Sequence, residues 1–299
     1  MKLRGILTAL ATPFKDGAVD WASLEHFVRW QIEEGVGGLV PCGTTGESPA
    51  LSEEEHLGVI RKTVEIAKGR VPVLAGCGGN ATKKTLELAT KVSALGVDAL
   101  LVVTPYYNKP TQQGLYHHYA QIAAGVRTPI CIYNVPGRTS VNIEPATVLR
   151  LAKEFPTIKA IKESSGNLDQ ASAIIREAPE GFAVLSGDDS LTLPMLAVGA
   201  AGAVSVVGNV APRLAADCCA AWDRSDIEGA RQIHLRLFPL VRSLFVESNP
   251  APVKWALKRL GRFASGELRA PLVEIEPSNA QKVERALRDA GLIKEPVTA

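Results

Sequence analysis

The sequence predicts an α/β protein of the (β/α)8 barrel class that carries a helical appendage after the barrel. Eight short apolar runs alternate with eight helix-like stretches across the first 223 residues. The runs are too continuously apolar for half-exposed strands, which predicts a parallel sheet covered by helices. Eight strands are also the number that closes such a sheet into a barrel.

The elements follow in order along the chain. The expected strands are residues 5–10, 37–41, 71–75, 99–103, 129–133, 158–162, 183–186 and 203–206. The expected helices are residues 21–34, 53–68, 81–95, 112–124, 144–154, 168–177, 191–198 and 212–223. N-capping residues support several starts: Asp20, Ser52 with Glu55 as a capping box, Asn80 and Asn167.

A doubly wound open sheet is the main alternative fold. Such sheets usually place a G-x-G-x-x-G turn after the first strand, where this chain has Ala11-Thr12-Pro13-Phe14. The glycine-rich turn Gly76-Cys77-Gly78-Gly79 lacks that spacing, and no G-K-[ST] phosphate loop occurs. A dinucleotide-binding protein is therefore disfavoured.

The alternation stops after Asp223. Three further helices are expected over residues 227–246, 252–260 and 279–292, and no linker separates them from the barrel. We expect a catalytic barrel over residues 1–223 and a helical region over residues 224–299 that packs on it.

Composition excludes several classes of function. Of the 299 residues, 46% are hydrophobic and only 5% aromatic, and the net charge is +2. Without a basic block, neither nucleic acid nor an anionic membrane is an expected partner. No uninterrupted apolar run of about 18 residues occurs, so no transmembrane helix is expected. Five cysteines without a C-x-x-C pair favour a reduced, cytoplasmic location.

The strand of residues 158–162 ends on a lysine. Because side chains alternate along a strand, Ile158, Ala160 and Lys162 are expected on one face. Apolar surroundings disfavour an ammonium and favour a neutral amine that can attack a carbonyl carbon. The alternative is a lysine that extends its charged end to the solvent.

Other polar residues follow the carboxyl ends of the strands, where barrel enzymes have their active sites. Tyr133 ends the fifth strand and should enter the same cavity as Lys162, where a phenol can carry protons. The turn Gly43-Thr44-Thr45-Gly46 can surround a carboxylate, and Arg138 can bind a second one. Taken singly, each also fits a packed aromatic, a plain turn or an exposed loop arginine. The pair His117-His118 is more typical of a solvated helix face than of a zinc site.

Together these residues resemble the pyruvate-dependent class I aldolases of the dihydrodipicolinate synthase/N-acetylneuraminate lyase family. The resemblance covers essentially the whole chain. It rests on Gly43-Thr44-Thr45-Gly46-Glu47, Tyr133-Asn134-Val135-Pro136, Ala160-Ile161-Lys162-Glu163-Ser164, Thr12-Pro13-Phe14, Thr104-Pro105-Tyr106-Tyr107 and residues 245–254. Within the family the chain is most similar to the branch that condenses pyruvate with L-aspartate β-semialdehyde in lysine and diaminopimelate biosynthesis.

The resemblance implies a role for each site residue. Lys162 would form a Schiff base with pyruvate, and Tyr133 would carry protons, linked through Thr44 to Tyr107 of a neighbouring subunit. Thr45 would hold the pyruvate carboxylate and Arg138 that of the semialdehyde. Gly187 and Val204 would shape the pocket. The resemblance also implies a homotetramer built as a dimer of dimers, and neither a metal nor an organic cofactor.

Members of this family that lysine inhibits bind it at a dimer interface. The matching positions are Ser48, Pro49, His56, Asn80, Lys84 and Tyr106. At Lys84 an acidic residue is usual, so weak or absent lysine inhibition is expected. Two other functions stay open: a related sugar-acid aldolase or dehydratase, and a non-catalytic barrel that binds a 2-oxo acid.

Overall fold

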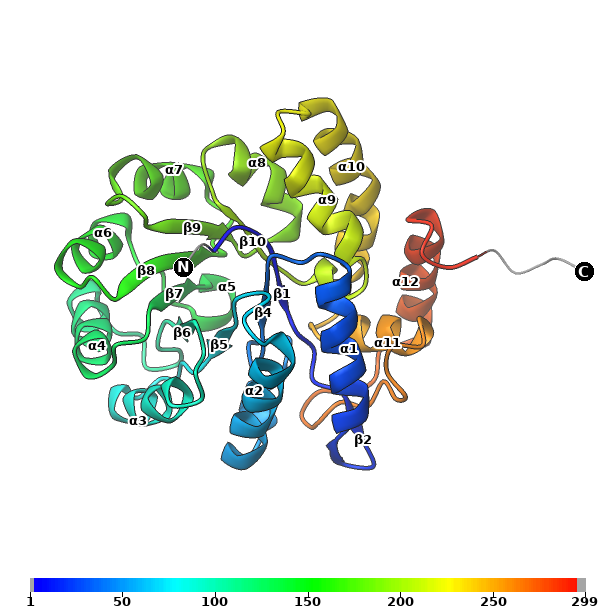
Figure 1. Cartoon of the computed structure of the whole chain (residues 1–299), viewed down its shortest axis with the longest axis horizontal. Coiled ribbons are helices and arrows are strands. Elements are labelled where there is room, and N and C mark those ends of the chain that lie inside the picture. Colours follow the sequence, from blue (N-terminus) through cyan, green and yellow to red (C-terminus); the bar gives the residue numbers. More distant parts are fainter. Residues whose placement is uncertain (1–2, 295–299) are drawn as a thin grey trace, which may run out of the picture.

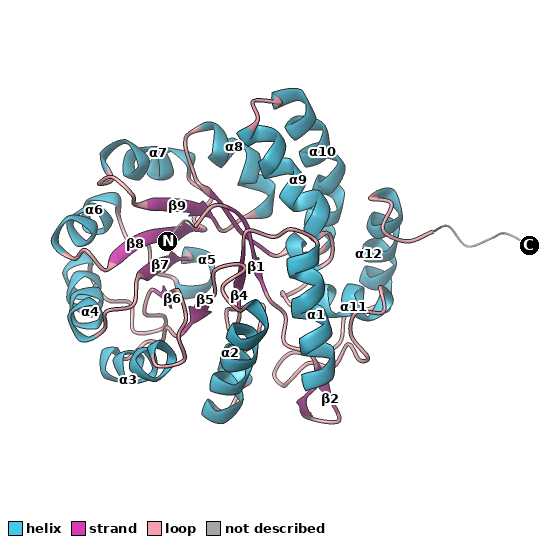
Figure 2. Cartoon of the chain, in the orientation of Figure 1, coloured by secondary structure: helices cyan, strands magenta, loops and turns pink. Residues whose placement is uncertain are grey.

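Eight parallel strands form a ring at the centre of the molecule, with helices around it (Figures 1 and 2). The computed structural model describes residues 3–294. The strands lie in the order β4-β1-β10-β9-β8-β7-β6-β5, and a bridge between Leu39 and Val73 brings the two ends of the sheet together. The predicted (β/α)8 barrel is therefore confirmed. Its strands are β1 (Gly5–Ala9), β4 (Gly38–Val40), β5 (Leu74–Gly76), β6 (Ala99–Val103), β7 (Ile130–Asn134), β8 (Ile158–Glu163), β9 (Ala183–Ser186) and β10 (Gly202–Ser205).

The expected helices are all present, with bounds that differ from the expected ones by three residues or fewer. They are α1 (Trp21–Glu33), α2 (Glu53–Ala67), α3 (Thr82–Ser93), α4 (Gln112–Gly125), α6 (Pro145–Glu154), α7 (Leu168–Glu177), α8 (Thr192–Ala197), α9 (Pro212–Asp223), α10 (Ile227–Ser243), α11 (Ala251–Arg259) and α12 (Pro277–Asp289). Asp20, Ser52 and Asn167 cap their helices as predicted, and Ser52 and Glu55 form the capping box. The prediction for Asn80 is wrong, because Ala81 is the N-cap of α3 and makes no side-chain cap bond.

Three 3₁₀ turns, Ser48–Ala50, Asp189–Leu191 and Val207–Asn209, and two other short elements were not predicted from the sequence. One is a hairpin of β2 (Phe14–Lys15) and β3 (Ala18–Val19) that turns through Asp16-Gly17. Both turn residues have positive φ, 53° and 81°, which suits the Asp-Gly pair of a tight hairpin. The other is the single turn α5 (Pro136–Thr139), which starts on a proline after β7 and positions Arg138.

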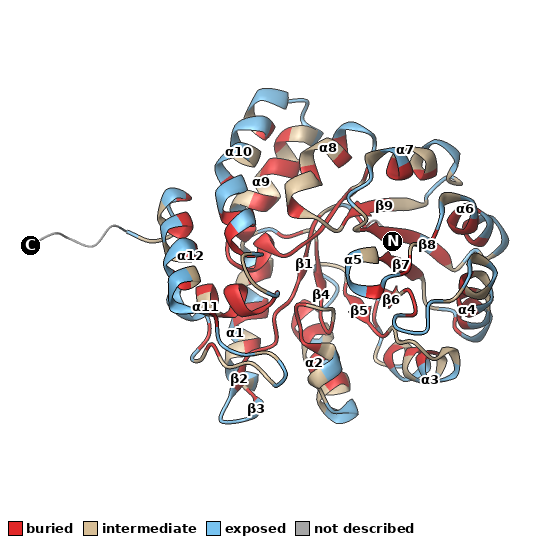
Figure 3. Cartoon of the chain, turned by 180° about the vertical axis from the view of Figure 1, so that it is seen from behind, coloured by how far each residue is buried: buried red, intermediate tan, exposed pale blue. Residues whose placement is uncertain are grey.

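The barrel core has two layers, because successive strand residues face opposite sides of the sheet. Interior residues such as Leu7, Leu101 and Cys131 form one apolar cluster, and the opposite faces of the strands pack with the helices in a larger one. Figure 3 shows the buried residues along the strands and the exposed residues on the outer helix faces.

The prediction that Ile158 shares a face of β8 with Ala160 and Lys162 is wrong. Ala160 and Lys162 face the interior side as expected, but Ile158 packs with the helix-facing cluster. The pairing of β7 with β8 shifts register at this point: Ile130 pairs with Ile158, and the next residue, Cys131, pairs with Ala160. Lys159 is the extra residue of this irregularity, which reverses the alternation before the strand reaches Lys162.

The C-terminal helices lie on one side of the ring. α10 packs along α9, and α12 contacts both α10 and α11 (Figure 1). Leu240, Val253 and Leu287 from these helices belong to the same apolar cluster as the helix-facing side of the barrel. We propose that the chain divides into a barrel over residues 1–223 and a helical region over residues 224–299. Within residues 3–294 no helix has the length and apolarity needed to cross a bilayer.

Candidate active site

A lysine and a tyrosine meet at the carboxyl end of two neighbouring strands. Lys162 of β8 and Tyr133 of β7 are register partners, and both side chains face the barrel interior. The Lys162 Nζ lies 4.0 Å from the centre of the Tyr133 ring. Only 5% of Lys162 and 6% of Tyr133 is exposed, so both functional groups have been removed from bulk water.

The surroundings of Tyr133 act on its phenol in opposite directions. Burial by itself raises the pKa of Tyr133. The positive charge of Lys162, the hydrogen bond with Thr44 and the charge of Arg138 all lower it, and the net direction of the pKa is downward. A phenol that gives up its proton more readily is better suited to move protons at a reacting carbon or oxygen.

A cavity of about 300 Å³ opens beside these two residues. Four residues named from the sequence, Thr44, Thr45, Arg138 and Gly187, line it. Two other candidates lie elsewhere. Val204 packs inside the barrel while Val206 lines the cavity, and Tyr107 is 90% exposed and lines neither this cavity nor its larger neighbour.

The C-terminal region completes the wall of the cavity. Val241 and Arg242 of α10, with Phe245 and Asn249 just after it, line the cavity, and none of them was expected there from the sequence. Asn249 Nδ2 donates a hydrogen bond to the Thr45 Oγ1 at 2.9 Å. Because that oxygen accepts from Asn249, the Thr45 hydroxyl hydrogen is free to be donated to a ligand.

The turn after β4 is held in a defined shape. The amide N–H groups of Gly46 and Glu47 donate to the carbonyls of Gly43 and Thr44. The amide N–H groups of Thr44 and Thr45 donate to no backbone carbonyl and are therefore available to a ligand. Glu47 has a φ of 53°, a left-handed conformation that costs a non-glycine residue on the order of 1 kcal/mol. Surrounding contacts must therefore hold it.

Two basic residues of the C-terminal region supply those contacts. Lys254 Nζ lies 2.7 Å from Glu47 Oε1, and both side chains are essentially fully buried. The backbone N–H of Arg269 donates to the other carboxylate oxygen of Glu47 at 3.0 Å. Burial lowers the pKa of Lys254, and the Glu47 carboxylate opposes that shift.

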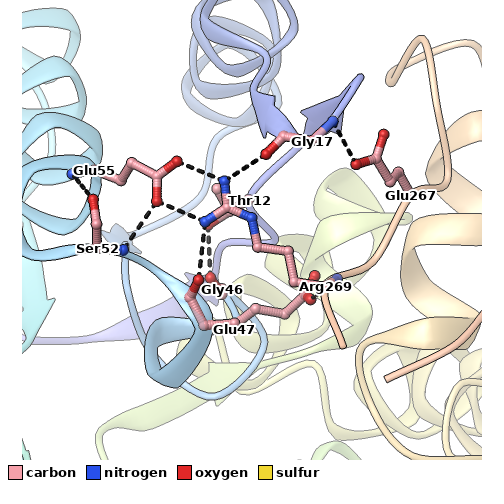
Figure 4. Close-up of polar contacts among 9 residues, drawn as sticks. Thr12, Gly17, Gly46, Glu47, Ser52, Glu55, Glu267 and Arg269 are labelled. Carbon is pink, nitrogen blue, oxygen red and sulfur yellow. Dashed lines mark hydrogen bonds and ion pairs between the residues drawn. The ribbon is translucent and has the colours of Figure 1, made fainter. Parts of the chain in front are cut away.

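Arg269 also ties the N-terminal hairpin and α2 to this turn, as Figure 4 shows. Its guanidinium forms a two-pronged pair with the Glu55 carboxylate and donates to the carbonyl of Gly17 at 2.9 Å. This pairing lowers the pKa of Glu55 to about 2. Arg269 therefore joins the C-terminal region to the N-terminal hairpin and to the turn and helix that follow β4.

A larger cavity of about 470 Å³ adjoins the first. Thr44, Tyr133 and Arg138 line both cavities, so the two lie side by side at these side chains. Of the residues that match the lysine site, the structure brings four into the wall of the larger cavity: Ser48, Pro49, His56 and Tyr106. Asn80 and Lys84 lie outside that wall, and Lys84 is exposed on α3.

The other residues considered for chemistry, His118 and the cysteines, are buried inside the fold. His118 is buried, which contradicts the expected solvated position; it contacts the Thr82 hydroxyl at 2.9 Å, and burial lowers its pKa to about 4. All five cysteines are buried and free, and burial raises their pKa values. Within the described residues, no cluster of three or more histidine, cysteine or acidic side chains is placed to hold a metal ion.

Gly187 is the position where an added methyl group should damage the site most directly. A Cβ there would lie 1.7 Å from Ser164 Oγ and 2.9 Å from Lys162 Cε. We expect Gly187→Ala to displace Lys162 and to lower kcat/KM for the reaction at this site by about 10²-fold, since small misplacements of reacting groups have effects of that size. Steady-state kinetics measures the change.

Gly266→Ala is the matched control, because the nearest atom to a Cβ at Gly266 is 3.6 Å away and the residue lines neither cavity. The control should keep full activity. Equal activity of the two alanine variants would show that Gly187 does not set the position of Lys162.

The fold and the site define a barrel protein of the lysine-centred type, in which a buried amine and a phenol face a cavity at the carboxyl ends of the strands. The chain belongs to the dihydrodipicolinate synthetase family, whose model matches residues 2–290.

Named relatives agree with this assignment. The chain is 50% identical to the 4-hydroxy-tetrahydrodipicolinate synthase of Koribacter versatilis, with full coverage of both chains. It is 49% identical to that of Thermodesulfovibrio yellowstonii, over 97% of this chain and 99% of the other. Among solved structures, the chloride-inhibited dihydrodipicolinate synthase of Acinetobacter baumannii, complexed with pyruvate, superposes with a TM-score of 0.94 at 43% identity, over 98% and 100% of the two chains.

Proposed function

We propose that this chain is a lyase that condenses pyruvate with L-aspartate β-semialdehyde to give 4-hydroxy-tetrahydrodipicolinate, a step towards diaminopimelate and lysine. The observation that carries the proposal is the buried pair of Lys162 and Tyr133 at the mouth of the barrel. The relatives of this chain are named 4-hydroxy-tetrahydrodipicolinate synthase. The five free cysteines fit a reducing compartment, and we place the enzyme in the cytoplasm.

The chemistry starts at the Lys162 amine. Its Nζ attacks the keto carbon of pyruvate, and loss of water gives an iminium that withdraws electrons from the neighbouring methyl group. Removal of a methyl proton gives an enamine, which attacks the aldehyde carbon and forms the new carbon–carbon bond. The amine of the second substrate then displaces Lys162 as the ring closes. Tyr133 carries protons in these steps, a role that its lowered pKa supports.

The carboxylates of the two substrates need separate partners. The Thr45 hydroxyl and the unused amides of the same turn are suited to the pyruvate carboxylate. Arg138, at the end of α5, is suited to the carboxylate of the semialdehyde. A sugar acid offers no second short-chain carboxylate to an arginine in this position, which favours the synthase over a sugar-acid aldolase or dehydratase.

Borohydride trapping tests the covalent step. Reduction in the presence of pyruvate should leave a stable adduct on Lys162 that peptide mass spectrometry locates. An adduct together with turnover of the semialdehyde supports the proposal, and an adduct with turnover of sugar acids alone supports the related aldolase. The absence of any adduct would leave a non-catalytic barrel that binds a 2-oxo acid.

Arg138→Ala should separate the two substrates. We expect KM for the semialdehyde to rise by about 10²-fold, because a charge-assisted pair is lost, while pyruvate trapping stays within a few-fold of the parent. Steady-state kinetics with each substrate varied in turn gives the comparison. Equal loss for both substrates would contradict the assigned role.

A second copy of the chain would complete the site. Tyr107 has a φ of 73° and is 90% exposed, so in one copy its phenol does not enter the cavity that Thr44 and Tyr133 line. We propose that Tyr107 extends into the site of a neighbouring subunit and links to Tyr133 through Thr44. The assembly would be a homotetramer made of two such dimers.

Lys84 leads to a prediction about feedback control. If lysine binds beside Ser48, His56 and Tyr106, an exposed ammonium on the neighbouring helix α3 repels the amine of the ligand. We expect lysine at millimolar concentrations to leave the activity nearly unchanged, and Lys84→Glu to increase inhibition at least several-fold. Inhibition assays over a lysine titration measure both, with Lys83→Glu as the control for added negative charge. Strong inhibition of the parent enzyme would overturn this view of Lys84.

A further inference from the structure

We infer that Glu163 is a positioning residue that sets the separation of Lys162 and Tyr133 through a buried network of amide side chains. The inference rests on the proposed function of those two residues. Glu163 directly follows Lys162 on β8, and Asn134 directly follows Tyr133 on β7. The two pairs occupy consecutive register positions, with Lys162 opposite Tyr133 and Glu163 opposite Asn134.

Alternation puts these pairs on opposite faces of the sheet. Lys162 and Tyr133 face the cavity, whereas Glu163 and Asn134 face the helices behind it. Glu163 is 4% exposed and Asn134 is fully buried. A contact that fixes the second pair also fixes the strand ends that carry the first.

The network around the Glu163 carboxylate is made of N–H donors. Asn134 Nδ2 donates to it at 3.0 Å, Gln170 Nε2 of α7 at 2.9 Å and the backbone N–H of Ser165 at 2.6 Å. Within residues 3–294 no ion pair joins Glu163 to a basic side chain. An ionised carboxylate only accepts hydrogen bonds, so it fits a pocket that presents only donors.

Asn142 closes the network. Its Oδ1 accepts from Asn134 Nδ2 at 2.8 Å, and its Nδ2 donates to Gln170 Oε1 at 2.9 Å. The backbone carbonyl of Glu163 also accepts from the N–H of Gly187 at 2.8 Å, which brings the residue after β9 into the same set. Glu163 thus joins the ends of three strands that line the catalytic cavity.

Because only N–H donors surround the Glu163 carboxylate, Glu163→Gln is the informative variant. Glu163→Gln keeps the size of the side chain but turns one oxygen into an NH₂ that faces donors. At least one hydrogen bond is then lost, and an N–H group is placed against another N–H group. The neighbouring Tyr133 and Lys162 should then shift relative to each other while the other residues of the cavity wall stay in place.

The second variant moves the carboxylate within the network. In Glu163→Gln/Gln170→Glu, the new amide at 163 can donate to the new carboxylate at 170, which also accepts from Asn142 Nδ2. Its oxygen can still accept from Asn134 and Ser165. The double variant therefore restores most donor–acceptor pairs without restoring the original residue at position 163. The bond that it loses is the one from Gln170 Nε2 to Asn142 Oδ1 at 3.1 Å.

The experiment measures kcat, KM for each substrate and the rate of borohydride trapping with pyruvate on the intact enzyme. We expect Glu163→Gln to lower kcat by about 10- to 100-fold with less than a threefold change in either KM, and the double variant to recover at least half of that loss on a logarithmic scale. The control for stability is Thr63→Val, which removes a buried hydrogen bond to the Val59 carbonyl within α2, where neither residue lines either cavity.

The outcomes are distinct. A fall in kcat that exceeds that of Thr63→Val at equal loss of melting temperature, together with rescue in the double variant, supports the positioning role. Unchanged kcat, or a loss without rescue, overturns it. If the parent enzyme itself gives no trapped adduct, the proposed function fails instead, and that failure is seen before any variant is compared.

Discussion

Replacing Lys162 by arginine should abolish turnover while leaving the fold intact. Arginine keeps the positive charge beside Tyr133, but its guanidinium stays protonated in proteins and does not form an imine with pyruvate. We expect kcat to fall by on the order of 10⁴-fold or more, as is found when an enzyme loses its nucleophile. The cavity of about 300 Å³ beside Lys162 leaves room for the larger side chain.

The same substitution at Lys159 is the matched control. Lys159 lies on the same strand, is exposed and belongs to the irregularity before Ala160, so Lys159→Arg should keep full activity. Borohydride trapping, steady-state kinetics and melting temperature together decide the matter. Appreciable turnover or a trapped adduct in Lys162→Arg would show that another amine forms the imine.

The sequence predicts the barrel well because each strand carries its own signal. A buried parallel strand is a short apolar run, and the turns between strands and helices have capping residues that can be recognised locally. The prediction that Ile158 faces the barrel interior was wrong because irregular strand pairing leaves no local signal in the sequence. Counting alternate residues assumes regular pairing, and the extra residue Lys159 is visible only in the pairing of β8 with β7.

The candidate site was predicted only in part. Residues at the carboxyl ends of the strands are found by position, and Lys162, Tyr133, Thr45 and Arg138 share a cavity as a result. The wall made by α10 could not be found in this way. Helical periodicity says that Val241 is buried but not which part of the barrel covers it.

Long-range polar contacts are the second gap. Lys254 and Glu47 are 207 positions apart, and nothing in either local segment indicates that they meet. A lysine on a helix is usually solvated, so burial of Lys254 is the opposite of what composition suggests. The contact is nevertheless one of those that hold the turn of Thr44 and Thr45 to the C-terminal region.

Lys254→Met should therefore destabilise the protein strongly. The substitution keeps an apolar side chain of similar length but removes the ammonium that lies 4.0 Å from the centre of the Phe14 ring, and it leaves the Glu47 carboxylate buried without its cation. Breaking a buried pair in this way costs about 3–5 kcal/mol of unfolding free energy. Denaturant unfolding measures the loss, and KM for pyruvate should rise in the same variant because Glu47 adjoins the turn that holds the carboxylate.

Two control variants test whether the stability lost in Lys254→Met comes from an unpaired buried charge. Lys91→Met breaks an exposed pair with Glu53 of nearly the same length, 2.6 Å, and should cost less than about 1 kcal/mol. Glu47→Gln/Lys254→Met removes both buried charges and keeps an oxygen for the Arg269 N–H, so it should recover much of the stability lost in Lys254→Met. If the double variant were no more stable than the single one, the cost would come from lost packing around Lys254 rather than from an unpaired buried carboxylate.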